Sequence, residues 1–299
     1  MPERRHLITI ADLTADDVER ILGTAEALAD ADVSDALRGR TVVNLFYESS
    51  TRTSSSFDLA ARRLGATTMT IRSAGSSVDK GESLRDTALT LSAYDPDVIV
   101  VRHPHAGAPE IVARSTDAHV VNAGDGKRAH PTQALLDLAT MRTALGRLEG
   151  LHVAIVGDVL HSRVARSLVE ALALVGARPI LVGPPTLVPA GLGVPLSADI
   201  ADIAAADVVY VLRMQRERMG AGASFVPSLR EYTARWGITP ERLRPGQLVM
   251  HPGPMNRGVE VDPRVADSPA SLVVDQVRAG LAVRTAVLYD VVGAALEVA

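Results

Sequence analysis

Three hydroxyl residues and an arginine lie where a predicted strand gives way to a predicted helix. An apolar run, residues 42–46, comes first, and apolar residues at helical spacing follow from Phe57 to Leu64. Between them stands the segment Ser50, Thr51, Arg52 and Thr53. The first N–H groups of a helix lack partners inside it and carry positive potential, so an anion bound there gains hydrogen bonds and charge complementarity. The segment predicts a phosphate-binding site, although the same residue types are also typical of an ordinary helix cap.

A second arginine and a histidine follow later apolar runs. The run Val98 to Val101 leads directly into Arg102, whose guanidinium can join Arg52 in holding a phosphate. His130 precedes a proline at the first position of a predicted helix, where positive potential favours the neutral imidazole. A neutral ring can donate one hydrogen bond to a carbonyl oxygen, and the amide of Gln133 lies one turn further along. Taken singly, an arginine or histidine of this kind is as typical of a surface or structural position.

A polar loop, residues 72–82, separates the second predicted strand from the next helix. It contains Ser76 and Lys80. Loops of this composition are commonly exposed and without a specific role. A lysine followed by glycine can nevertheless reach into a site and neutralise phosphate charge.

Two strand ends in the second half of the chain each deliver an arginine. The run Val153 to Val156 leads into a turn that ends at Arg163, and Val208 to Leu212 leads into Arg213 and Gln215. Paired guanidiniums suit a small dicarboxylate, because each can bind one carboxylate through two hydrogen bonds. The glycine fingerprint of a dinucleotide site and the Gly-Lys-Ser/Thr loop are both missing from the sequence, so we expect no nucleotide cofactor.

A proline-rich turn follows the last predicted strand, residues 248–250. It reads His251, Pro252, Gly253, Pro254. Fixed backbone carbonyls in such a turn can accept hydrogen bonds from an amide or an amine, and a merely stiff loop has the same local sequence.

Short β-branched apolar runs alternate with helical patterns along the chain. This alternation is typical of parallel sheets covered by helices on both faces, and it occurs twice. In the first half, strands are expected at 41–46, 67–71, 98–101 and 119–121. In the second half, they are expected at 151–156, 180–182, 208–212 and 248–250. A helical stretch, 132–145, is expected to connect the two α/β domains, and a final helical run extends over 277–298.

Length and composition restrict the class of protein. The 299 residues suit about two domains, and a net charge of −4 indicates neither a nucleic-acid nor a membrane partner. The absence of cysteine excludes disulfides, zinc–cysteine sites and thiol nucleophiles, and favours a cytoplasmic protein. Residues 1–10 lack the apolar core of a signal peptide.

Taken together, these motifs resemble those of the carbamoyltransferase family, and within it the catalytic chains of aspartate carbamoyltransferases. The matching segments keep the family's order over nearly the whole chain: Ser50 to Thr53, Arg102 to Pro104, His130 to Gln133, Arg163, Arg213 to Gln215 and His251 to Pro254. The resemblance implies transfer of a carbamoyl group from carbamoyl phosphate to L-aspartate in pyrimidine (UMP) biosynthesis, without metal or cofactor. It also implies a carbamoyl-phosphate domain, 1–131, completed by a C-terminal helix, 280–299, and an aspartate domain, 132–279.

The resemblance further implies a role for each motif. Phosphate contacts are expected from Ser50, Thr51, Arg52, Thr53 and Arg102, carbamoyl contacts from Thr53, His130 and Gln133, and backbone contacts from Gly253 and Pro254. Aspartate is expected to bind Lys80, Arg163, Arg213 and Gln215, and the catalytic set is Arg52, Thr53, Lys80, Arg102 and His130. Ser76 and Lys80 match loop residues that reach into a neighbouring subunit's site, which implies a homotrimer with shared active sites. A regulatory chain or a dihydroorotase chain is an additional partner that the motifs neither require nor exclude.

The sequence leaves two alternative functions open. Ornithine carbamoyltransferases share the phosphate and His-Pro motifs but carry a cysteine in the proline turn, which here reads His251 to Pro254. Arg213 would also repel a cationic side chain. A non-catalytic two-domain anion-binding protein is the second alternative, and His130, Lys80 and the arginines of the second half count against it.

Overall fold

The computed structural model describes residues 5–72, 81–215 and 225–293 and divides the chain into two compact units. Unit 1 comprises Met1–Leu136 and Arg278–Ala299, and unit 2 comprises Asp137–Val277. Both breaks fall inside helices, a few residues from the boundaries predicted at 131/132 and 279/280. A functional division at the predicted boundaries stays a prediction.

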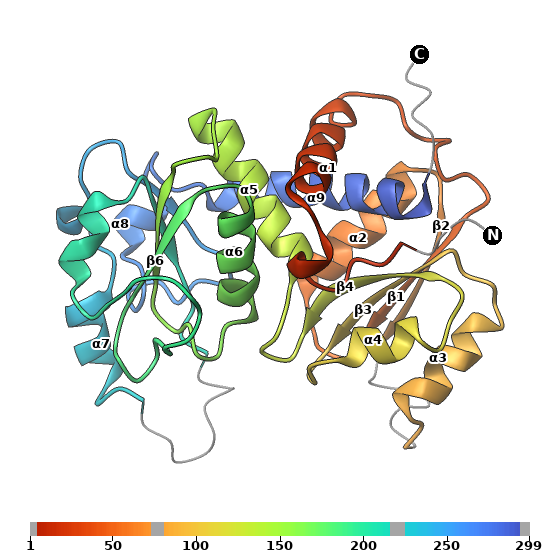
Figure 1. Cartoon of the computed structure of the whole chain (residues 1–299), viewed down its shortest axis with the longest axis horizontal. Helices are drawn as coiled ribbons and strands as arrows, with labels where there is room; N and C mark the ends of the chain where they lie inside the picture. The colour runs from red at the N-terminus through yellow and green to blue at the C-terminus, as the bar shows by residue number, and fades with distance from the viewer. Residues whose placement is uncertain (1–4, 73–80, 216–224, 294–299) are drawn as a thin grey trace. The chain divides into compact units, whose positions relative to one another are not determined.

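Unit 1 is built on a four-stranded parallel sheet (Figure 1). The strand order is β2-β1-β3-β4. Its elements are η1 (Ile10–Asp12), α1 (Ala15–Ala27), β1 (Thr41–Phe46), α2 (Thr51–Arg63), β2 (Thr67–Arg72), α3 (Leu84–Ser92), β3 (Val98–His103), α4 (Ala108–Ala113), β4 (His119–Asp125), the start of α5 (Pro131–Leu145) and most of α9 (Val273–Val292).

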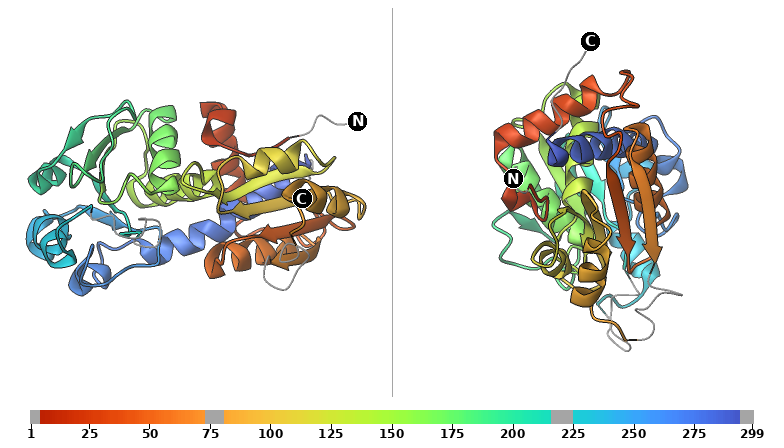
Figure 2. Two further views of the ribbon diagram at one scale, coloured as in Figure 1. Left: turned by 90° about the horizontal axis from the view of Figure 1, so that it is seen from below. Right: turned by 90° about the vertical axis from the view of Figure 1, so that its right-hand side faces the viewer.

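Both faces of this sheet are covered because the inner strands are apolar on both sides. One core cluster joins residues of β1, β3 and β4, such as Leu45, Ile99 and Val120, to Leu91 of α3 and Val112 of α4. Helices α2 and α9 lie on the opposite face, and Figure 2 shows the same layers from two further directions.

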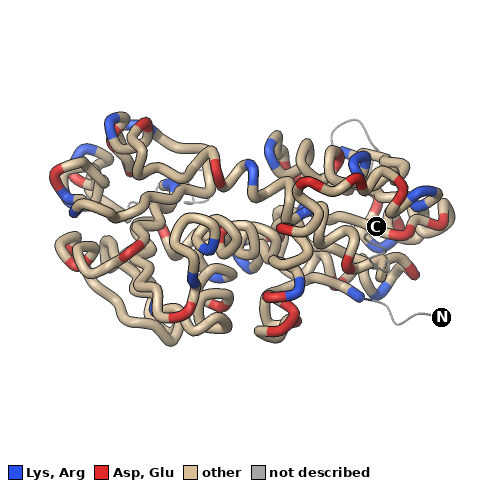
Figure 3. The backbone as a smooth tube through the Cα atoms, turned by 90° about the horizontal axis from the view of Figure 1, so that it is seen from above, with Lys and Arg blue, Asp and Glu red and all other residues tan. Residues whose placement is uncertain are grey.

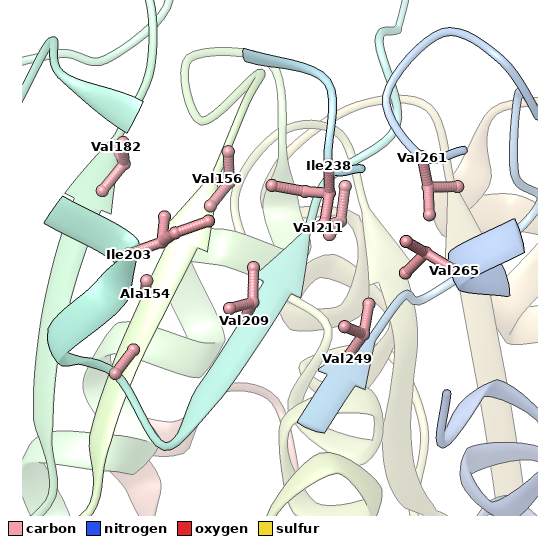
Figure 4. Packing of buried hydrophobic residues seen from close by; sticks show 11 residues of the cluster. Ala154, Val156, Val182, Ile203, Val209, Val211, Ile238, Val249, Val261 and Val265 are labelled. Atoms are coloured by element: carbon pink, nitrogen blue, oxygen red, sulfur yellow. The ribbon is translucent and has the colours of Figure 1, made fainter. Parts of the chain in front are cut away.

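Unit 2 carries a five-stranded parallel sheet of order β7-β6-β5-β8-β9. Its elements are the rest of α5, β5 (His152–Val156), α6 (Arg163–Leu174), β6 (Arg178–Val182), β7 (Leu196–Ser197), η3 (Ile200–Ala205), β8 (Val208–Val211), α7 (Leu229–Trp236), η5 (Pro240–Arg242), β9 (Leu248–Met250), α8 (Pro263–Ala266) and the first turn of α9. Valines dominate its core, with Val156, Val209 and Val249 of three strands packed against Ile203 and Val265 (Figure 4).

The predicted α/β class with two parallel sheets is confirmed, and several predicted element boundaries are wrong. β3 ends at His103, not Val101, because Arg102 still pairs with Phe46. β4 continues to Asp125, four residues beyond the strand predicted at 119–121. α9 begins at Val273, four residues before the helical run expected from Val277. The two-residue strand β7 was not predicted.

Acidic and basic residues are interspersed along the chain in both units (Figure 3), in keeping with the small net charge. Among the described helices, none is both long and apolar enough to cross a membrane.

The first turn of α1 gives a test of stability. Thr14 caps the helix by accepting the Asp17 N–H at 3.1 Å, and its hydroxyl donates to the Asp17 carboxylate at 2.6 Å. The hydrogen bond from the Thr14 hydroxyl, a second one from the Thr14 N–H to Asp17 Oδ2 at 2.9 Å, and the nearby Arg20 lower the pKa of Asp17 from 3.8 to about 2. We expect Thr14→Ala to lower the free energy of unfolding by about 1 kcal/mol in urea titrations at neutral pH.

The cost of that substitution should shrink in acid. The unfolded chain binds more protons than the folded chain between the two pKa values of Asp17, so the stabilisation is lost as the pH falls from about 4 towards about 2. Thr24→Ala, inside the same helix, is the matched control and should change stability little. An equal cost for both variants would contradict the assigned cap.

Candidate active site

The predicted phosphate-binding site lies at the start of α2. Ser50 is the cap residue of this helix, and its Oγ accepts the Thr53 N–H at 3.3 Å. Thr51 and Arg52 are exposed in the first turn, whereas Thr53 is buried. An anion at this terminus can therefore reach exposed side chains and helix N–H groups together.

A pocket of about 330 Å³ opens at this helix terminus. The residues that line it include Tyr47, Glu48, Ser50, Thr51, Ser54 and Arg72. Of the predicted phosphate set, the pocket includes Ser50 and Thr51 but not Arg52, Thr53 or Arg102. Arg72, the last residue of β2, is a cationic lining residue that sequence reasoning missed, because the end of β2 was read as the start of an exposed loop.

Arg102 lies beside the loop that leads into α2. It pairs with Phe46 in the β1–β3 register, and its carbonyl accepts the Tyr47 N–H at 2.8 Å. Its guanidinium donates to the Ala123 carbonyl at 3.1 Å, and its Nε lies 3.4 Å from Glu48 Oε2. The guanidinium is therefore held at the sheet edge next to the predicted phosphate-binding site.

Burial shifts the pKa values of two aromatic side chains near Arg102, those of Tyr47 and His103. Burial lowers the pKa of His103, and the neighbouring His105 lowers it further. Burial also raises the pKa of Tyr47, whose ring centroid lies 4.6 Å from that of His103. Both groups are thus favoured in their neutral forms at pH 7.

A buried carboxylate shapes the loop before His130. Asp125 Oδ1 accepts from Asn122 Nδ2 at 2.8 Å and from the Ala129 N–H at 3.1 Å, and its Oδ2 accepts the Gly107 N–H at 2.8 Å. His130 follows directly and is buried, as is Gln133 in the first turn of α5. Unit 1 therefore brings Arg102, His130 and the α2 terminus to the carboxyl edge of one sheet, where parallel α/β sheets bind ligands.

In unit 2, a single carboxylate connects two predicted aspartate-binding loops. Asp158, two residues after β5, is completely buried. Its Oδ1 accepts from His161 Nδ1 at 2.8 Å and from the His161 N–H at 3.2 Å, and its Oδ2 accepts the Gln215 N–H at 3.1 Å. Arg163 begins α6 in the first of these loops and is buried, while Arg213 follows β8 in the second. The adjacent strands β5 and β8 thus bring the predicted arginines and Gln215 to one edge.

Gly157 permits this close approach. Its φ is +115°, and a Cβ at this position would lie 2.7 Å from the Tyr232 hydroxyl and 3.2 Å from the Leu212 carbonyl oxygen. A side chain would therefore push the Asp158 turn away from the strand next to it.

The remaining predicted residues fall in two places. Gly253, partly buried, and Pro254, exposed, lie in the turn after β9 of unit 2. Ser76 and Lys80 lie outside the described residues. Among the residues that the structure describes, no group of three or more acidic or histidine side chains is arranged to hold a metal ion.

Sequence reasoning missed the carboxylates that hold these loops. Neither Asp125 nor Asp158 was among the predicted site residues. An acidic residue directly after glycine at the end of a buried strand was the available signal in both cases.

The fold and the strand-edge groups define a two-domain α/β protein with a predicted anion-binding site in one unit and a predicted dicarboxylate site in the other. Family models match both halves. Residues 5–143 match "Aspartate/ornithine carbamoyltransferase, carbamoyl-P binding domain", and residues 149–291 match "Aspartate/ornithine carbamoyltransferase, Asp/Orn binding domain". The chain belongs to the aspartate/ornithine carbamoyltransferase family.

Individual relatives are similar over nearly their whole lengths. The chain is 54% identical to an aspartate carbamoyltransferase catalytic subunit of Salinispora arenicola, covering 97% of this chain and 98% of the relative. The structure of Trypanosoma cruzi aspartate transcarbamoylase in complex with N-(phosphonacetyl)-L-aspartic acid superposes with a TM-score of 0.87 at 31% identity, covering 96% of this chain and 95% of the other. Ornithine carbamoyltransferase from Pyrococcus furiosus has a TM-score of 0.84 at 29% identity, covering 95% and 96%.

Asp158 gives a test of the unit 2 site. Asparagine keeps only one acceptor oxygen, so Asp158→Asn cannot hold both His161 and the Gln215 N–H. We expect its affinity for succinate, titrated calorimetrically with phosphate present, to fall about tenfold or more, and its affinity for phosphate to change by less than about twofold. Asp202→Asn, on an exposed residue of η3, is the control. Equal succinate affinity in the two variants would show that Asp158 does not position this site.

Proposed function

We propose that this chain is the catalytic chain of an aspartate carbamoyltransferase. It transfers the carbamoyl group of carbamoyl phosphate to the amine of L-aspartate, giving N-carbamoyl-L-aspartate and phosphate in pyrimidine (UMP) biosynthesis. The observation that carries this proposal is the pocket at the start of α2, which is lined by Ser50 and Thr51 and lies within the segment matched by the carbamoyl-phosphate domain model.

The residue roles follow the motifs. The α2 terminus, with Ser50, Thr51, Arg52 and Thr53, and the Arg102 guanidinium bind the phosphate. His130 and Gln133 bind the carbamoyl group, together with the backbone of Gly253 and Pro254, and Arg163, Arg213 and Gln215 bind aspartate. The loop residues Ser76 and Lys80 complete the site from a neighbouring subunit. Residues 1–131, completed by residues 280–299, form the carbamoyl-phosphate domain, and residues 132–279 form the aspartate domain.

The reaction proceeds by direct attack and needs no covalent enzyme intermediate. The aspartate amine nitrogen bonds to the carbamoyl carbon to form a tetrahedral intermediate, and the bond from that carbon to the phosphate oxygen then breaks. Thr53, His130 and Arg102 stabilise the oxyanion, each contributing about 3 kcal/mol of barrier reduction if it acts like other oxyanion donors. The departing phosphate accepts the proton that the amine loses, and no side chain is required as general base.

Aspartate is favoured over ornithine by the groups of unit 2. Arg213 lies two residues after the buried strand β8, and its guanidinium suits the second carboxylate of aspartate and opposes the ammonium group of ornithine. The turn after β9 carries glycine and proline and lacks the cysteine found in ornithine enzymes.

The assembly and location extend the same proposal. The chain forms a homotrimer with shared active sites and acts in the cytoplasm. A regulatory chain or a dihydroorotase chain is compatible with this assembly as an additional partner. A purely anion-binding protein without turnover is less well supported, because it has no need of the predicted carbamoyl-binding residue His130.

An assay with both amino acids tests the reaction. We expect the purified chain to release phosphate from carbamoyl phosphate with L-aspartate and to show no measurable turnover with L-ornithine. N-(phosphonacetyl)-L-aspartate, which joins a phosphonate to aspartate, should raise the melting temperature more than phosphate or succinate alone, because it engages both substrate sites. Turnover with ornithine alone would reverse the assignment, and stabilisation without any turnover would favour the anion-binding alternative.

The Arg213→Gln variant tests the aspartate assignment. Losing the cation removes a charge-assisted pair with one substrate carboxylate, so the KM for aspartate should rise about tenfold or more while inhibition by phosphate is retained. Arg230→Gln, on an exposed residue of α7, should leave both constants unchanged. Parallel loss of aspartate and phosphate binding in the Arg213 variant would show that this residue is misassigned.

A further inference from the structure

Interior side chains hold the turn after β9 by its N–H groups. The His251 N–H donates to Gln276 Oε1 at 2.9 Å, and the Gly253 N–H donates to His251 Nδ1 at 2.8 Å. The Asn256 N–H donates to Glu260 Oε1 at 2.5 Å. These bonds occupy donors only, so they leave the carbonyl oxygens of Gly253 and Pro254 available to a ligand.

The His251 ring belongs to the same arrangement. Because Nδ1 accepts the Gly253 N–H, the neutral ring carries its proton on Nε2, which lies 3.3 Å from Glu260 Oε1. His251 and Glu260 are both buried. The ring thus links the two ends of the turn.

Gln276 connects this turn to the interior of unit 2. It lies in the first turns of α9, and its Nε2 donates to Asp137 Oδ1 of α5 at 2.8 Å. The other oxygen of Asp137 accepts from the Tyr210 hydroxyl of β8 at 2.7 Å. Since a carboxylate only accepts, Asp137 sets which way the Gln276 amide faces, and Oε1 is directed to the His251 N–H.

All members of this chain of hydrogen bonds are buried. Tyr210 and Asp137 are completely enclosed, Gln276 is 4% exposed and His251 is 2% exposed. Hydrogen bonds in such surroundings are stronger than in water, and a missing partner is correspondingly costly. These hydrogen bonds connect α5, β8, the turn after β9 and α9, so they resist small displacements of the turn relative to the helices and strands.

We propose that Gln276 is a positioning residue of the carbamoyl transfer, with Asp137 and Tyr210 acting through it. It fixes the position of the His251 N–H and thereby the direction of the Gly253 and Pro254 carbonyls. These carbonyl oxygens accept hydrogen bonds from the N–H groups of the carbamoyl group or of the attacking amine. This inference rests on the proposed function. It assigns a role to three residues that do not themselves touch the substrates.

The decisive variant is Gln276→Met, which keeps the length of the side chain and removes both polar groups. We expect kcat to fall about tenfold or more with a smaller change in the KM for aspartate, because misaligned carbonyls affect the reacting groups more than the carboxylates. Inhibition by phosphate, which binds in unit 1, should be unchanged.

Gln247→Met is the matched control. Gln247 is also buried in unit 2, beside the other end of β9, and its amide makes three hydrogen bonds, to Ile203, Ala206 and Arg244. Both variants should lose stability, but only the Gln276 variant should lose kcat. Equal kinetic losses in the two would overturn the positioning role.

A gentler variant covers the case in which Gln276→Met does not fold. Tyr210→Phe keeps the buried ring and removes only the hydroxyl bound to Asp137, so kcat should fall about threefold with the same pattern in KM. An unchanged kcat in this variant would overturn the role of Tyr210 and, where Gln276→Met does not fold, the proposal as a whole.

Amide hydrogen exchange separates this inference from the proposed function. In Tyr210→Phe and Gln276→Met, the peptide that covers residues 249–256 should exchange faster, and in Gln247→Met it should not. If the wild-type protein shows no turnover while the two variants still exchange faster, Gln276 still holds the turn after β9 and the enzyme assignment is refuted. If the wild-type protein turns over and the variants keep both its exchange rate and its kcat, only the positioning role of Gln276 is refuted.

Discussion

Buried carboxylates hold the loops on which the candidate site depends. Asp125 in unit 1 and Asp158 in unit 2 are completely enclosed, lie at or just after the ends of parallel strands and accept hydrogen bonds from the loops that follow. An ionised carboxylate is costly to bury unless such bonds satisfy it. The loop backbone and the carboxylate therefore stabilise each other, and the loop conformation becomes part of the folded core.

The same principle extends to the second part of unit 2. Asp137 and Glu260 are also completely buried, and each accepts from groups that lead to the turn after β9. The predicted substrate-binding residues are thus mostly cationic or neutral, and the carboxylates that hold their loops are buried. Glu48 is an exception, because it lines the pocket at α2 and lies beside Arg102.

The parallel sheets explain why these pieces come together. Successive strands of a parallel sheet end at one edge, so residues far apart in sequence, such as Arg163 and Arg213, follow neighbouring strands β5 and β8. In unit 1 the pairing of Phe46 with Arg102 has the same effect. The spacing along the chain is set by the helices between the strands, which is why the motifs are recognisable only as an ordered series.

The sequence by itself determined the fold class, the strands with continuous β-branched runs and the positions of the site motifs, because these depend on local periodicity and residue type. Only the tertiary structure decided that β3 reaches His103, that Arg72 lines the pocket and that Asp158 connects two loops. Strand ends and buried polar partners are settled by pairing between distant segments, and such pairing leaves no periodic mark in the local sequence.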